Sequence, residues 1–203
     1  MFEATLHLND AAYAFLPGHR IRLALSTAYW PITWPPPWRF TLTLHAQGSL
    51  LLLPVRPPRS DDERLRQLEE PESAPALETT DLHEGATLKS VSSTGAGQIV
   101  YRMSTEIAGD GPALTRIEDT GTEHGHSVVE EFSIAEAEPL SATAEILHDA
   151  VFRRDSWSTR VRTRTRMHSD SSDFHLEAEL EAFEGDRRIH HRTSSVTVAR
   201  ELV

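Results

Sequence analysis

The sequence predicts an all-β protein, because segments of alternating apolar and polar residues recur along most of its 203 residues. From residue 79 to residue 203 these segments are evenly spaced, and glycine, aspartate, serine or proline separates each from the next. Such spacing is typical of an antiparallel meander, folded as a curved sheet, a sandwich or a barrel. The expected strands cover about 86–93, 98–107, 113–120, 127–134, 142–153, 157–168, 174–183 and 188–198.

The first 58 residues also contain strand-like patterns. Apolar side chains take every second position in residues 3–8, 19–25 and 40–44, which indicates strands with one face toward a core. Residues 50–55 are apolar almost throughout, so we expect a strand buried on both faces or lying under a neighbouring domain.

The segment between these two regions reads as a short helix and a linker. Ser60 and Glu63 form a capping box, which predicts a helix over about residues 61–68. Pro71 and Pro75 cannot continue it, and the stretch around them has the composition of a linker. The predicted organisation is therefore a first β module at 1–58, a helix and linker at 59–78, and a second β module at 79–203.

Composition restricts the class of protein. The formal net charge is −11, and residues after position 58 hold 29 of the 31 acids against 16 of the 20 bases. This acidity disfavours binding to nucleic acid or to an anionic membrane. Mean hydropathy is −0.40 and no apolar run approaches a membrane span. With no cysteine and no visible secretory signal, we expect a cytoplasmic protein.

The sequence specifies one hairpin in detail, centred on residues 171–172. Four arginines alternate along its first strand and three glutamates along its second: Arg160, Arg162, Arg164, Arg166, Glu177, Glu179 and Glu181. Symmetric closure pairs residues whose numbers sum to 343, which places the arginines from Arg162 onward opposite the glutamates. Each exposed pair contributes only about 0.2–1 kcal/mol, so the ladder sets register more than stability.

Residues 15–38 are the most distinctive stretch. They read FLPGHRIRLALSTAYWPITWPPPW and combine a turn, a strand and a loop rich in tryptophan and proline. This stretch resembles the C-terminal domain of the X-prolyl dipeptidyl-peptidase and cocaine-esterase (CocE/NonD) family of serine hydrolases. The resemblance runs from about residue 9 through LTLTLHAQGSLLLLPVRPP, and more loosely to the ending VARELV.

The resemblance implies that residues 1–58 are part of a jelly-roll β-sandwich of the galactose-binding type. It also implies a parent enzyme that hydrolyses esters, or peptide bonds after proline, through an acyl-enzyme. The α/β-hydrolase domain of that family is not present in this sequence, so the chain alone is expected to be inactive, without a cofactor. Its expected partners are that catalytic domain or further copies of itself. The alternative is a free-standing β-rich module that binds carbohydrate or protein, or that assembles.

The candidate interface lies in the loop of residues 29–38, here called the aromatic loop, and in the strand-like segment before it. It comprises four aromatic residues and two arginines: Tyr29, Trp30, Trp34, Trp38, Arg20 and Arg22. In the resembled hydrolases the jelly-roll packs against the catalytic and cap domains, so a docking surface is the favoured interpretation. Ordinary core packing and a stacking platform for a sugar or proline-rich peptide remain as alternatives.

Motifs for chemistry are sparse. No G-x-S-x-G nucleophile elbow occurs, and we assign no catalytic residue. His124 and His126 are the best metal candidates, since residues two apart on a strand project to the same side, where Glu123 or Glu130 could add an oxygen ligand. A solvated turn between acidic strands is the favoured interpretation, because no second histidine pair with ligand spacing accompanies them, and we expect no metal.

Overall fold

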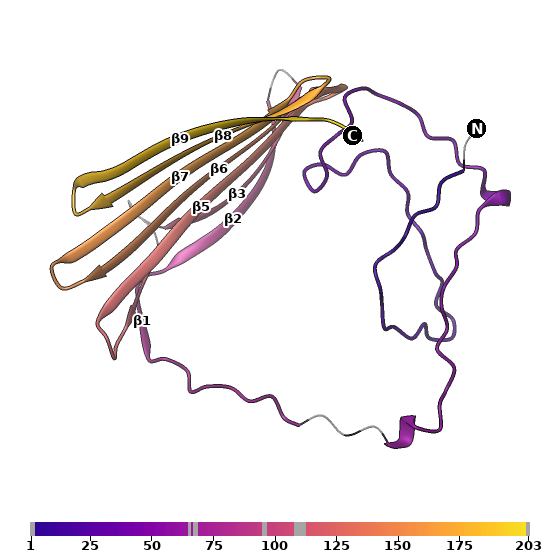
Figure 1. Ribbon diagram of the computed structural model, residues 1–203, viewed down its shortest axis with the longest axis horizontal. Coiled ribbons are helices and arrows are strands. Elements are labelled where there is room, and N and C mark those ends of the chain that lie inside the picture. The colour runs from indigo at the N-terminus through magenta and orange to yellow at the C-terminus, as the bar shows by residue number, and fades with distance from the viewer. Residues whose placement is uncertain (1–2, 65, 67–68, 95–96, 108–112, 202–203) are drawn as a thin grey trace.

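The computed structural model describes residues 3–64, 66, 69–94, 97–107 and 113–201. Residues 79–199 contain a nine-stranded antiparallel sheet, while the described residues before Thr79 run as loops beyond one end of it (Figure 1). The strands are β1 (Thr79–His83), β2 (Gly85–Ser93), β3 (Gln98–Ile107), β4 (Leu114–Ile117), β5 (Thr122–Ala135), β6 (Glu138–Arg154), β7 (Trp157–Ser169), β8 (Asp173–Glu184) and β9 (Arg187–Ala199). The all-β class predicted from the sequence is confirmed.

Strands β5 to β9 follow one another as an up-and-down meander, and all neighbours are antiparallel. The other edge of β5 is shared, because β3 pairs with its second half and β4 with its beginning. Strand β2 then flanks β3, and β1 flanks β4. The long strands twist and curve together, and Figure 1 shows them as one continuous layer.

The predicted register of the β7–β8 hairpin is confirmed. Arg162 lies opposite Glu181, Arg164 opposite Glu179 and Arg166 opposite Glu177. The ion pairs, however, run to the strands on either side: Arg160 and Arg162 bond Asp149, Arg164 bonds Glu145, Arg188 bonds Glu181, and His191 bonds Glu179. Acidic residues flank the arginine row on both neighbouring strands, so pattern alone predicted the register but not the partners.

The strands predicted in the first module are not formed. Residues 3–58 contain only an isolated bridge between Tyr29 and Thr33 and a 3-10 turn at Ala46–Gly48. A strand is defined by its hydrogen bonds to a neighbour, and alternation of side chains does not supply one. The partial jelly-roll expected for residues 1–58 therefore has its sequence pattern but not its sheet.

The helix expected at residues 61–68 is a single 3-10 turn, Asp62–Arg64, while positions 65, 67 and 68 lie outside the described residues. The Asp62 carboxylate accepts the Arg59 N–H at 3.0 Å and forms an ion pair with Arg56, so it stabilises the chain before the turn rather than capping it as predicted for Ser60. Two strands differ from their predicted ranges: β4 ends at Ile117 instead of about residue 120, and β5 begins at Thr122 instead of about residue 127. Strand β1 was not predicted. No helix in the described ranges is long or apolar enough to cross a bilayer.

Side-chain burial in the sheet is concentrated around a few positions. Leu114, Ala142 and Val151 are the apolar residues exposed by 4% or less. Near Leu114 the chain passes very close to β5, where a Cβ atom on Gly125 would stand 1.6 Å from the Ala113 carbonyl oxygen. Glycine at position 125 is thus required for β4 to reach the β5 edge.

We expect Gly125→Ala to destabilise the sheet by about 1–3 kcal/mol or more, because the added methyl overlaps backbone that cannot move independently. Urea unfolding followed by circular dichroism measures the change. Gly48→Ala is the matched control, since a Cβ there meets nothing within 4 Å. Equal stability of the two variants would contradict the close approach.

Candidate functional site: the aromatic loop on the sheet

The aromatic loop lies against one end of the β-sheet. Trp30 and Trp34 contact each other edge to face, with ring centroids 5.0 Å apart. Trp30 also meets Phe132 of β5 at 6.1 Å, and Trp34 meets Phe174 of β8 at 5.9 Å, both edge to face. Such geometry directs the positive ring edge of one aromatic at the negative face of another. Two segments more than a hundred residues apart in sequence are thereby joined.

Polar contacts fix the same loop to the end of β7. The Trp34 indole N–H donates to the Ser169 hydroxyl at 2.9 Å, and Ser169 is only 6% exposed. Arg200, which follows β9, donates to the Ser169 hydroxyl at 3.1 Å and to the Pro35 carbonyl oxygen at 2.6 Å. Its guanidinium lies 4.7 Å from the centroid of the Phe174 ring, as expected for a cation–π contact.

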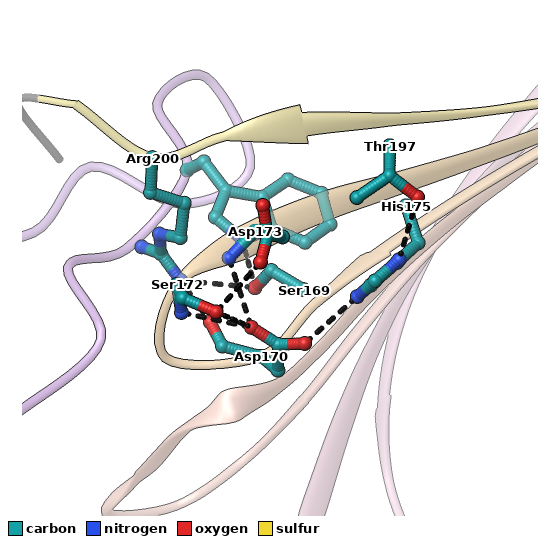
Figure 2. Close-up of polar contacts among 8 residues, drawn as sticks. Ser169, Asp170, Ser172, Asp173, His175, Thr197 and Arg200 are labelled. Atoms are coloured by element: carbon teal, nitrogen blue, oxygen red, sulfur yellow. Dashed lines mark hydrogen bonds and ion pairs between the residues drawn. The ribbon is translucent and has the colours of Figure 1, made fainter.

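Arg200 therefore holds three segments together: the aromatic loop, the β7–β8 turn and the end of β9 (Figure 2). Partial burial lowers the pKa of its guanidinium, although the Asp170 carboxylate acts in the opposite direction. We call the set Trp30, Trp34, Pro35, Ser169, Phe174 and Arg200 the loop anchor.

The β7–β8 turn beneath the loop anchor is organised by Asp170. One oxygen of its carboxylate accepts the backbone N–H groups of Ser172 and Asp173, each at 2.8 Å. The other oxygen lies 2.9 Å from His175 Nε2 (Figure 2). The bond to His175, followed by the two backbone bonds, holds the pKa of the Asp170 carboxyl well below its usual range.

Asp170, His175 and Thr197 form a chain that resembles part of a nucleophilic triad in composition. His175 Nδ1 lies 3.4 Å from the Thr197 hydroxyl, while His175 Nε2 contacts the carboxylate. Asp170 is already engaged by the turn backbone, and His175 stacks on His168 with centroids 4.9 Å apart. These contacts explain the three residues as supports of the turn, and we assign them no catalytic role.

The structure separates the six residues of the predicted interface. Trp30 and Trp34 are half-buried in the loop anchor, whereas Tyr29 and Trp38 are 67% and 65% exposed. Arg20 and Arg22 are exposed on the preceding segment. Sequence reasoning missed Ser169, Asp170 and Arg200. The polar run around residues 169–173 signals a turn, but nothing in the sequence links that turn or Arg200 to the tryptophans.

The metal candidates His124 and His126 lie on β5, which begins earlier than the strand expected at 127–134, and on one side of that strand. His126 approaches His148 of β6 with centroids 5.9 Å apart, and His124 stacks on Phe152 at 6.3 Å. Of the two proposed carboxylates, Glu123 pairs with Arg116 at 2.6 Å. Another group, Glu179, Glu181 and His191, has ligand atoms within 4.8 Å of one another. Within it Glu179 and His191 bond each other, and the Glu181 carboxylate bonds Arg188 outside the group.

Residues 1–96 match the family model of the X-Pro dipeptidyl-peptidase C-terminal non-catalytic domain. This confirms, for those residues, the resemblance seen in the sequence. The matched segment contains the aromatic loop and ends between β2 and β3, so the sheet residues of the loop anchor lie outside it. No curated protein and no solved structure matches the chain.

Trp34→Ala should weaken docking of the aromatic loop by about 1–3 kcal/mol, because it removes one edge-to-face contact and the indole hydrogen bond to a nearly buried hydroxyl. Faster tryptic cleavage at Arg39 would report the released loop. Trp38→Ala is the control, since Trp38 is 65% exposed and its loss should change docking by less than about 0.5 kcal/mol. Identical digestion of both variants would contradict the loop anchor.

Asp170→Asn should lower the melting temperature at neutral pH. Because the folded pKa of Asp170 is depressed, its stabilising contribution is present above the unfolded value of about 3.9 and is lost as pH falls through the folded value. The difference between wild type and variant should therefore shrink below about pH 4. Thermal melts across pH 2–7 measure it, with Asp186→Asn in the β8–β9 turn as control. A difference that stays constant with pH would contradict the assignment.

Proposed function

We propose that this chain forms a non-catalytic β region of an X-prolyl dipeptidyl-peptidase or esterase of the cocaine-esterase (CocE/NonD) type, and that it braces an α/β-hydrolase catalytic domain. The observation that carries the proposal is the exposure of the apolar positions in residues 3–58, within the family match. Leucines and other residues that the pattern directs inward are 44–69% exposed in three of the expected strands: Leu6, Leu8, Ile21, Leu23, Leu25, Phe40, Leu42 and Leu44.

Residues 50–53 show the same feature with alternation preserved. Leu50 and Leu52 are 86% and 85% exposed, whereas Leu51 and Leu53 are each 40% exposed. These four residues thus keep the alternating exposure of a strand, although no other part of the described chain covers them. Many large apolar side chains exposed in one segment support a contact of that segment with another protein or domain.

The accessible surface of the whole chain leads to the same conclusion. It measures 17000 Å² for a mass of 22.7 kDa. A compact monomer of this mass exposes only about 9,500 Å². The excess of accessible surface over that of a compact monomer supports a large contact with a partner. The catalytic domain that the resemblance implies is the favoured partner.

The loop anchor gives the brace a mechanical basis. It ties the aromatic loop to the end of β7, the start of β8 and the residue after β9 through Ser169, Phe174 and Arg200, and Trp30 also contacts Phe132 of β5. A catalytic domain bound to residues 3–58 would then be connected to a long, hydrogen-bonded sheet. The sheet could shape access to the catalytic cleft or join subunits, while the acyl-enzyme chemistry would belong entirely to the partner.

The experiment supplies an X-prolyl dipeptidyl-peptidase α/β-hydrolase domain in trans and measures binding by sizing with light scattering. We expect the full chain to co-elute with it, and Leu23→Glu to reduce the affinity at least about tenfold by placing a charge in the apolar contact. Ala24→Glu is the matched control, because alternation places Ala24 on the opposite face from Leu23, and it should bind like wild type.

The same samples test activity. The chain alone should leave chromogenic ester and X-Pro substrates intact, because the proposal assigns it no nucleophile. Turnover by the chain alone would overturn the non-catalytic role. Equal binding by Leu23→Glu and Ala24→Glu would overturn the proposed contact surface. Self-association without binding to the hydrolase domain would favour the free-standing assembly module.

A further inference from the structure

Strand β9 forms an open edge of the sheet. The strand order of the described residues ends at β9, which pairs with β8 on one side. All thirteen of its residues, Arg187–Ala199, are exposed. An edge of this length presents a row of backbone groups that can pair with another extended chain.

The direction of those backbone groups follows from the ladder. Arg200 N–H donates to the Ser172 carbonyl oxygen at 2.8 Å, and the register from Asp173 to Ala182 continues from this pair without a shift. In an antiparallel pair, hydrogen-bonded positions alternate with positions whose N–H and C=O point away. Val196 and Val198 therefore bond β8, whereas the N–H groups of Thr193, Ser195 and Thr197 point out from the edge.

The charge of this edge is opposite to that of the chain. Residues 187–200 contain four arginines, two histidines and no acid, although the net charge of the protein is −11. Its inner neighbour β8, Asp173–Glu184, contains five acids and no lysine or arginine. Strand β9 thus already pairs with one acidic strand, because Arg187, Arg188 and His191 bond glutamates of β8. Arg192 makes no ion pair within the described part of the chain, so its charge is available to a further strand.

The positive charge of β9 restricts the kind of chain that can pair with its open edge. A second copy joined through its own β9 would bring two positively charged strands together. The opposite end of the sheet is divided between β2, which contains Lys89 and no acid, and β1, which is only five residues long. The one acid of β1, Asp81, already accepts a hydrogen bond from the Thr115 hydroxyl at 2.8 Å, so neither strand offers a long acidic complement. An acidic segment from a different protein or domain would pair with the outward backbone groups of β9 and would also complement its positive charge.

We propose that β9 binds an extended acidic segment of a partner as an additional antiparallel strand of the sheet. Arg192, Val196 and Val198 share one face of β9, and the two valines are 54% and 48% exposed. A complementary strand places apolar side chains beside the valines and a carboxylate beside Arg192. An antiparallel partner meets Val198 first, then Val196 and then Arg192. Its sequence therefore needs an apolar residue, a second apolar residue two positions later, and an acidic residue four positions after that.

The probe is a fluorescent nine-residue peptide in which threonines alternate with valine, valine, serine and glutamate, in that order. We expect saturable binding to the full chain by anisotropy, weakened by salt. Replacing the glutamate of the peptide by lysine, or Arg192→Glu in the protein, should each reduce affinity about three- to tenfold. Equal binding of the two peptides would overturn the charge complementarity.

A proline substitution separates edge pairing from ordinary surface binding. Ser195→Pro removes an outward N–H and leaves the β8 ladder intact, so it should abolish peptide binding while the circular dichroism spectrum is kept. Ser195→Ala keeps the N–H and should bind like wild type. Hydrogen exchange on the wild-type chain provides a second readout: the amides of Thr193, Ser195 and Thr197 should gain protection with peptide.

Unchanged exchange at those three amides would overturn the proposal even if Ser195→Pro failed to fold. So would self-association through β9, detected by light scattering and abolished by Ser195→Pro, because the occupant would then be a second copy. These outcomes concern β9 and are independent of the contact proposed for residues 3–58.

Discussion

The antiparallel hydrogen-bond ladder from β5 to β9 is the interaction on which the rest of the structure depends. Few side chains are fully buried, with Val151 and Ser104 the largest of them in the described residues. The long strands are therefore held by backbone bonds and cross-strand pairs more than by a thick core. Ion pairs across β6, β7, β8 and β9 reinforce one register, because a slip of one residue would exchange the charged and apolar faces.

That ladder provides a fixed end against which the aromatic loop packs. Ser169 closes β7, Phe174 opens β8 and Arg200 follows β9, so the meander itself brings them together. The loop contributes Trp34 and Pro35 from residues far away in sequence. The family-matched segment and the sheet beyond it are thus coupled through a small number of polar and aromatic contacts, which is what a bracing role requires.

The two open surfaces of the protein have different physical character. Residues 3–58 expose apolar side chains in a strand-like pattern, and β9 exposes backbone groups next to arginines. Burial of apolar area is non-directional and suits a broad contact with a folded domain. An unpaired strand edge is directional and suits one extended segment. The two proposed contacts therefore differ in kind and do not compete for the same residues.

The sequence by itself determined the all-β class, most strand positions after residue 79 and the register of the β7–β8 hairpin, because side-chain alternation and turn residues act locally. It also carried the family resemblance of the first module. Only the tertiary structure decided that Trp30 and Trp34 pack on the sheet while Tyr29 and Trp38 stay exposed, that Arg160, Arg162 and Arg164 bond β6, and that the first module's strands have no partners. Those outcomes depend on which distant segments meet, and no local pattern encodes that choice.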